Sequence, residues 1–204
     1  MLLARHAGVL LAKHVTVHLG IVAMSRRPLV IAVPHGGLPV AARVAALIGA
    51  DLRAVVVRRV TAIDPQRACL ATVTAEGSPV FDHDSIRRLH TSADALTVPV
   101  GRQRTEAAEL TARYHHELPN TEITGRVVVV VDDGLVTGLS ACAVLHRLRA
   151  ARPARLVMAT PVTSPEARRR LVSCTDALIC PHTTTTALEQ CYADFHRLPD
   201  GDVE

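Results

Sequence analysis

The chain has 204 residues, a length that suits one α/β domain with at most a small appended subdomain. Its formal net charge is +4, but the basic residues are dispersed and aromatic residues make up only 2% of the chain, so a nucleic-acid-binding surface with stacking rings is not expected. The segment 1–15 is interrupted by charged residues and histidines, so neither a signal peptide nor a membrane span is expected.

The core has to be built from aliphatic side chains, because hydrophobic residues are 49% of the chain and tryptophan is absent. This composition is typical of parallel strands covered on both faces by alanine-rich helices. The five cysteines include no CxxC pair, which predicts a chain without a disulfide framework and a cytoplasmic setting. Cys142 is expected to pack in the core, one turn into a helix.

The first half of the chain predicts alternating helices and strands. Apolar side chains recur at helical spacing near the N-terminus, and Pro39 suits the first turn of a helix that Gly49 ends. The expected elements are a helix over 3–23, a strand over 29–33, a tight turn over 34–37, a helix over 39–48, and a strand over 52–57 that finishes at Arg58 and Arg59.

The second half begins with 61–97, the least regular stretch, which we interpret as a flap or hood with a hairpin and a short helix near 85–89. Strands that alternate with helices predict a doubly wound, mainly parallel sheet with helices on both faces. We therefore expect one α/β domain over 1–204. The apolar face of its N-terminal helix also favours a homodimer. The remaining elements are helices over 102–118, 138–150 and 165–172 and strands over 127–131, 155–160 and 177–180.

The segment 127–141, VVVVVDDGLVTGLSA, carries the clearest functional signal. Five valines predict a buried strand, and two carboxylates follow at its carboxyl end, where open α/β sheets bind ligands. The two Asp side chains can serve two neighbouring hydroxyls, or a hydroxyl and a metal ion. The next helix begins in the following loop, and its first N–H groups favour an anion. The pattern predicts a sugar-phosphate site made of Asp132, Asp133, Gly134, Val136, Thr137, Gly138, Leu139, Ser140 and Ala141.

A purely structural interpretation of this segment is the weaker one. An Asp after a parallel strand often caps the next helix, and a lone DDG sequence would favour that explanation. The whole pattern, with GxxTGxS and a helix after the strand, favours a ligand. The sequence contains neither GxGxxG nor GxxxxGK[ST], which disfavours a dinucleotide or P-loop site.

Residues 132–140 resemble the phosphoribosyl diphosphate (PRPP) motif of type I phosphoribosyltransferases. Further segments resemble a bacterial branch of predicted phosphoribosyltransferases with a PRGG-like turn. These segments are IAVPHGGLPVAARVAA at 31–46, VVVRRV at 55–60, ATPVTS at 159–164 and a Y-x-D-F sequence at 192–195. The resemblance spans most of the chain and is faintest over 61–97.

The resemblance implies a role for each candidate residue. Asp132 and Asp133 would hold the ribose hydroxyls, directly or through Mg²⁺, and residues 136–141 would bind the 5-phosphate. The diphosphate would be bound by His35, Gly36, Gly37, Arg58 and Arg59. The implied reaction transfers ribose 5-phosphate from PRPP to a nucleophile, commonly a base nitrogen, and releases diphosphate. The sequence does not identify the acceptor.

Two positions differ from the relatives. His35 stands where they usually carry Arg, and Val136 stands where some purine-salvage members carry an Asp base. The loop therefore supplies no proton acceptor, and the candidates for a catalytic base are His35 and Glu76. Two alternatives stay open: a non-catalytic protein of the same fold that binds PRPP or a nucleotide, and a hydrolase of ribose-phosphate compounds.

Overall fold

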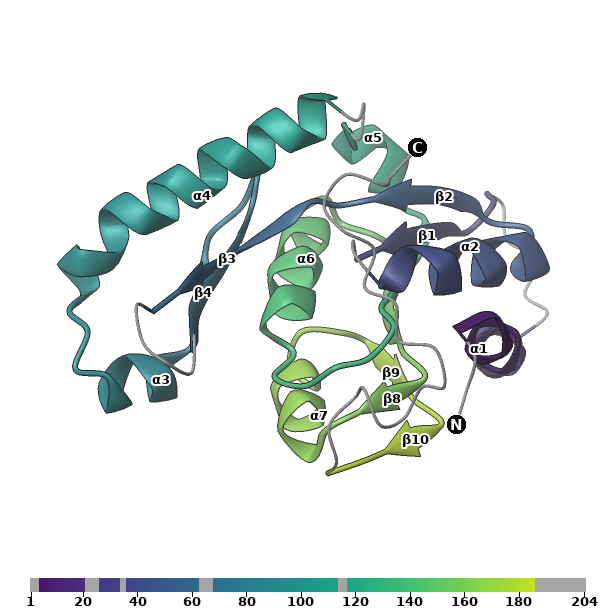
Figure 1. Cartoon of the computed structure of the whole chain (residues 1–204). Coiled ribbons are helices and arrows are strands. Elements are labelled where there is room, and N and C mark those ends of the chain that lie inside the picture. Colours follow the sequence, from purple (N-terminus) through teal and green to yellow (C-terminus); the bar gives the residue numbers. More distant parts are fainter. Residues whose placement is uncertain (1–3, 21–25, 34–35, 63–67, 114–116, 186–204) are drawn as a thin grey trace.

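A five-stranded parallel sheet forms the centre of the structure, a computed structural model that describes residues 4–20, 26–33, 36–62, 68–113 and 117–185 (Figure 1). The strand order is β2-β1-β6-β7-β9, and every neighbouring pair is parallel. The strands are β1 (Leu29–Ala32), β2 (Asp51–Ala54), β6 (Val127–Val131), β7 (Arg155–Ala159) and β9 (Ala177–Ile179).

Helices cover both faces of this sheet, as predicted. Helices α1 (Ala4–Leu19) and α2 (Gly37–Ile48) cover one face, and α6 (Leu139–Ala150) and α7 (Pro165–Leu171) cover the other. The valines of β6 alternate between the two cores: Val129 and Val131 pack with α1 and α2, whereas Val128 and Val130 pack with α6 and α7. Each of these four valines is fully buried, which stabilises the sheet by roughly 1.5–3 kcal/mol apiece.

A second unit, which we call the hood, stands beside the sheet (Figure 1). Its antiparallel strands are β3 (Val57–Thr61), β4 (Cys69–Thr74) and β5 (Val80–Phe81), and its helices are α3 (His83–Arg88) and α4 (Ala93–Arg113). Helix α4 packs on one face of the hood sheet, over a small core that includes Val60 and Leu96. Helix α6 contacts the other face and so joins the hood to the central sheet.

The structure corrects the predicted strand over 52–57. The central strand β2 ends at Ala54, and the hood strand β3 begins at Val57. Arg58 and Arg59 therefore lie inside a hood strand instead of at a strand end. The apolar run through Val55 and Val56 is buried throughout, so hydrophobicity alone does not reveal that the chain passes from one sheet to another.

The hood is larger than the predicted flap, because it begins at Val57 and continues through α4. That helix begins at Ala93, whereas the prediction began at Arg102, and it contains Pro99. Proline inside a helix removes one backbone hydrogen bond and normally indicates a break. Burial of Leu96 against the hood strands favours the helix across that position.

The other element boundaries lie close to their predicted positions. Helix α2 ends at Gly49, which has the left-handed φ of 66° expected for a glycine cap. Very short elements were not predicted: α5 (Asn120–Ile123) and the pair formed by β8 (Val162–Thr163) and β10 (His182–Thr183). In the described part of the chain, no helix has both the length and the apolar character that crossing a membrane would require.

Candidate functional site

The candidate site lies where the connections of two neighbouring strands diverge. Strand β1 leads into α2 on one face of the sheet, whereas its neighbour β6 leads into α6 on the other face. In open α/β sheets, ligands bind beyond the carboxyl ends of the strands at such a divergence. The loop after β1 leads to Gly36 and Gly37, and the loop after β6 begins with the predicted Asp pair, so the topology places these four residues together.

Contacts between these two loops are close. A Cβ atom on Gly36 would lie 1.8 Å from Oδ2 of Asp133, and one on Gly37 would lie 3.0 Å from the carbonyl oxygen of Val131 and 3.3 Å from Oδ1 of Asp132. Only glycine leaves room for both carboxylates at these positions. The structure thus brings Gly36 and Gly37 against the predicted Asp pair, whereas His35 lies outside the described residues.

Asp132 is the more buried of the two acids, with 8% of its surface exposed. Its Oδ1 accepts a hydrogen bond of 2.9 Å from the Asp133 N–H. Burial raises the pKa of the Asp132 carboxyl well above its usual range, and the neighbouring Asp133 carboxylate raises it further. A cation or hydroxyl donor placed here would favour the charged form and lower that pKa, so the arrangement suits a ligand that brings positive charge or O–H groups.

The loop after Asp133 is held from one side by α7. The Ser164 hydroxyl donates to the carbonyl oxygen of Val136, and the Arg170 guanidinium donates to the carbonyl oxygen of Thr137. In a trans peptide the carbonyl and the following N–H point in opposite directions. The N–H groups of Thr137 and Gly138 therefore point away from α7.

The same loop forms the N-terminus of α6. Gly138 precedes the helix with a left-handed φ of 73°, and a Cβ there would lie 3.3 Å from the Cα of Ala167. Among the described residues, no acceptor is found for the N–H groups of Thr137, Gly138, Ser140 and Ala141. Unpaired N–H groups at the positive end of a helix dipole attract an anion, and the loop has the chemistry of a phosphate site.

The hood is joined to this loop at two places. On β4, the Thr72 hydroxyl donates to the carbonyl oxygen of Leu139 at 3.0 Å. Arg170 also pairs with Asp82 at 3.5 Å, just before α3. Ser164 and Arg170 were not among the predicted site residues. Ser164 before Pro165 is a helix-start signal, but nothing in the sequence connects α7 to the loop.

The two predicted diphosphate arginines have different environments. The Arg58 guanidinium donates to Glu106 at 3.0 Å and to Gln103 at 3.3 Å, so this side chain faces α4. Arg59 is exposed and is the cross-strand partner of Thr72. Cross-strand partners share one face of a sheet, so Arg59 is on the face that contacts the start of α6.

Glu76, a candidate base, is not brought to the loop. Its carboxylate pairs with Arg147 at 2.5 Å, and Arg147 also donates to the carbonyl oxygen of Leu118. Arg147 lies eight residues beyond Leu139, about 12 Å along α6 from the loop.

One known protein family matches most of this chain. The phosphoribosyl transferase domain family matches residues 11–196, which is most of the sequence. The chain belongs to this family. The phosphoribosyltransferase resemblance predicted from the motifs is therefore confirmed.

Two curated relatives are phosphoribosyl transferases by provisional name. They are MT0597 and Rv0571c, from two strains of Mycobacterium tuberculosis, and each is 29% identical over 176 residues. The match covers 85% of this chain but only 40% of each relative. This family member therefore spans about two fifths of the length of these two relatives.

Solved structures show the same fold. TT1426 from Thermus thermophilus is 33% identical, with a TM-score of 0.75 over 98% of this chain and 94% of its own. The APRTase of Giardia lamblia, solved with 9-deazaadenine, is 13% identical, with a TM-score of 0.51 over 88% of this chain and 80% of its own. The second likeness is one of fold alone. Both confirm the predicted α/β architecture of this family member.

Proposed function

We propose that this phosphoribosyltransferase domain binds PRPP with Mg²⁺ and transfers its ribose 5-phosphate to a nucleobase-like nucleophile, with release of diphosphate. One observation carries the proposal. The unpaired N–H groups at the start of α6 lie directly after a pair of carboxylates, at the divergence of β1 and β6. An anion site beside acceptors for a diol matches the 5-phosphate and ribose ends of one ligand.

In this proposal, the chain fixes the ribose 5-phosphate from two sides. The N–H groups of Thr137, Gly138, Ser140 and Ala141 donate to the phosphate oxygens. The Asp132 and Asp133 carboxylates accept hydrogen bonds from the ribose 2′ and 3′ hydroxyls. These bonds are stronger than those between neutral groups because the acceptors are charged. Because α7 holds the loop carbonyls away, phosphate binding needs no rearrangement of those two peptide groups.

The Asp pair also fits Mg²⁺. Mg²⁺ prefers oxygen ligands, and among the described residues no basic side chain pairs with Asp132. No set of three or more acidic, histidine or cysteine ligands occurs in the described residues, so a bound ion would keep water or substrate oxygens as its other ligands. When bound, Mg²⁺ would neutralise negative charge on the diphosphate leaving group.

We assign diphosphate binding to Gly36, Gly37 and Arg59. His35 directly precedes Gly36 in the sequence and lies outside the described residues. The two glycines precede or begin α2, whose N-terminal N–H groups favour an anion. Arg59 is on the hood face that contacts the start of α6, whereas Arg58 is bound to Glu106. The bond from the anomeric carbon to diphosphate breaks, the bond to the acceptor nitrogen forms, and the acceptor proton passes to a base or to water.

Calorimetric titration with PRPP and MgCl2 tests this proposal. Binding is expected for the native chain, and Asp132→Asn and Asp133→Asn are each expected to weaken it about tenfold or more, because each loses a charge-assisted hydrogen bond of about 1.5–3 kcal/mol. Asp94→Asn removes the same charge from an exposed position at the start of α4 and serves as the matched control. No binding heat, or equal binding by all variants, contradicts the proposal.

The arginine assignment has its own pair of variants. Arg59→Ala is expected to weaken PRPP binding more than Arg58→Ala does, while both bind ribose 5-phosphate like the native chain. Arg58→Ala is expected to lower stability instead, because it leaves Glu106 without a hydrogen-bonded cation on α4. An Arg58→Ala variant that loses PRPP affinity while Arg59→Ala retains it contradicts the assignment.

A non-catalytic PRPP- or nucleotide-binding protein of the same fold is the second candidate. It is favoured by Val136, an apolar side chain that is 57% exposed in the loop, and by the pairing of Glu76 with Arg147. Neither supplies a base to the site. Release of diphosphate from PRPP across a panel of nucleobases separates the two candidates: turnover with any base favours the transferase, and binding without release favours the regulator.

A further inference from the structure

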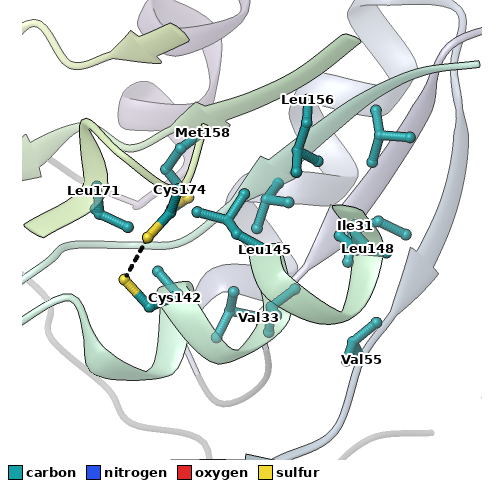
Figure 2. Close-up of a cluster of buried hydrophobic side chains, with 14 of the residues drawn as sticks. Ile31, Val33, Val55, Cys142, Leu145, Leu148, Leu156, Met158, Leu171 and Cys174 are labelled. Atoms are coloured by element: carbon teal, nitrogen blue, oxygen red, sulfur yellow. Dashed lines mark hydrogen bonds between the residues drawn. The ribbon is translucent and has the colours of Figure 1, made fainter. Parts of the chain in front are cut away.

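Two cysteines from different elements lie close together in the core, below the loop between β6 and α6. Cys142 lies one turn into α6, and Cys174 lies in the turn that follows α7. Their sulfur atoms are 3.2 Å apart, and Figure 2 shows them pointing at each other between these two elements. Both residues are buried, with 2% and 8% of their surfaces exposed.

A histidine completes this cluster. His146 is on α6, one turn beyond Cys142, and its Nε2 is 3.5 Å from the Cys174 sulfur. The Cys142 thiol and then the imidazole can donate to a Cys174 thiolate, and together they lower the pKa of Cys174 although burial opposes them. The neighbouring Cys174 sulfur and burial raise the pKa of Cys142. Cys174 is therefore suited to attack an oxidant as a thiolate, and Cys142 is suited to attack the oxidised Cys174 afterwards.

We propose that Cys142 and Cys174 are an oxidation site at which hydrogen peroxide forms a reversible disulfide between α6 and the turn after α7. The Cys174 thiol first gives up its proton, and the thiolate attacks one peroxide oxygen. The O–O bond breaks, Cys174 becomes a sulfenic acid, and the hydroxide that leaves takes up that proton and forms water. The Cys142 sulfur then attacks the Cys174 sulfur, the S–S bond forms, and the sulfenic oxygen leaves with the Cys142 proton as a second water. In total, two thiols are oxidised and one peroxide is reduced to two waters.

The geometry requires only a small movement. A disulfide bond is about 2.05 Å long, so the two sulfurs must approach by roughly 1.2 Å. Cys174 is in the same turn as Val172, which lies two residues earlier and is 68% exposed, so a local opening of this turn admits a small oxidant. Cys174 belongs to no strand, so a movement of its side chain breaks no hydrogen bond between strands of the sheet.

The other described thiols lack this arrangement. Cys69 and Cys180 are half-buried, and each has a pKa raised mainly by burial, which disfavours the reactive thiolate. Neither has a second cysteine as a hydrogen-bond partner among the described residues. They are therefore internal controls for non-specific oxidation.

Peptide mapping of the full chain tests the proposal. The protein is treated with a few equivalents of hydrogen peroxide, free thiols are blocked with N-ethylmaleimide, and the chain is cut after arginines and before aspartates. Cutting before Asp176 separates Cys174 from Cys180, which trypsin alone leaves in one peptide. The expected product links peptide 133–147 to peptide 171–175 and is lost on treatment with dithiothreitol.

Variants identify the order of the two steps. Cys142→Ala is expected to retain a Cys174 sulfenic acid that dimedone traps, whereas Cys69→Ala is expected to form the disulfide like the native chain. The proposal is overturned if peroxide leaves both thiols open to N-ethylmaleimide, links Cys174 to another cysteine, or takes Cys174 to a sulfinic acid without a link. Mapping of the native chain decides this even if Cys142→Ala does not fold.

The position of the pair gives the oxidation a structural consequence. The disulfide would join α6, which begins in the loop after β6, to the turn after α7, the helix whose Arg170 binds the carbonyl oxygen of Thr137. It closes a long loop of chain, and the melting temperature of the oxidised form is expected to rise on the order of 5 °C. Because both readouts concern thiols and stability alone, they hold or fail independently of PRPP binding.

Discussion

Replacing Gly36 with alanine perturbs the Asp pair without introducing a new charge. The φ of Gly36 is −115°, which alanine adopts readily, so backbone strain is not the issue. The added methyl group would lie 1.8 Å from Oδ2 of Asp133, whereas ordinary contacts between non-bonded atoms are about 3.5 Å. The carboxylate must therefore retreat by about 1.7 Å, which it can do by rotating its side chain.

That displacement should affect binding far more than folding. A hydrogen bond from a hydroxyl to oxygen spans about 2.5–3.0 Å, so a carboxylate moved by about 1.7 Å loses its ribose hydroxyl. The loss of one charge-assisted hydrogen bond, about 1.5–3 kcal/mol, raises the Kd for PRPP by about 10- to 150-fold. The rotation costs about 0.5–1.5 kcal/mol in stability, and replacing glycine offsets about 0.4–1 kcal/mol through the unfolded state. The melting temperature should change by only a few degrees.

Titration calorimetry with PRPP and Mg²⁺ measures the Kd for PRPP. Thermal unfolding followed by circular dichroism measures the change in melting temperature. Gly101→Ala is the matched control, because a Cβ there meets no atom within 4 Å and the residue lies in helix α4. It should bind PRPP like the native chain and be slightly more stable. A Gly36→Ala variant that binds PRPP with native affinity would refute the placement of Asp133 against the ligand.

Three further variants probe the loop and the sheet. Gly138→Ala forces a side chain into a left-handed φ and should lower the unfolding free energy by about 1–3 kcal/mol in urea titrations. Arg170→Ala removes the hydrogen bond to the Thr137 carbonyl and should weaken PRPP binding several-fold, with partial recovery in Arg170→Lys; equal affinities would contradict a supporting role. The Arg149 hydrogen bond lowers the pKa of Asp176, so its stabilisation is present above the unfolded pKa near 3.9 and is lost as pH falls through the lower folded value. Asp176→Asn should be about 1 kcal/mol less stable at pH 7, a modest effect because the pair is partly exposed, and the difference from the native chain should shrink below about pH 4.

Local information in the sequence was enough to predict much of the fold. Buried strands and amphipathic helices alternate along it, and this alternation alone predicts a doubly wound parallel sheet. The carboxylates and glycines of 132–138 follow the strongest strand, and any such strand delivers its next residues to the carboxyl edge of the sheet. The predicted neighbourhood of Gly36, Gly37, Asp132 and Asp133 follows from that rule.

Other features depended on contacts between residues far apart in the chain. The apolar run at 54–57 passes between two sheets, and no periodicity marks the crossing, because both environments bury it. Arg58 and Arg59 are adjacent and chemically identical, yet the alternation of a strand sends one toward Glu106 on α4 and the other to the face that contacts α6. The pairing of β3 with β4 and the packing of the hood sheet determine which arginine faces α4 and which is on the face toward α6.

Fold class and family could both be predicted from residues close together in the chain, because they depend on local patterns, and the ligand chemistry of the loop between β6 and α6 stays a prediction. Long-range packing settled the rest. It placed Glu76 on Arg147, away from the loop, and brought Arg170 to the carbonyl of Thr137. It also brought the sulfur atoms of Cys142 and Cys174 to within 3.2 Å although 32 positions separate the two residues in sequence. Side-chain contacts of this range are set by how helices pack on the sheet, which depends on the whole core and not on the residues that touch.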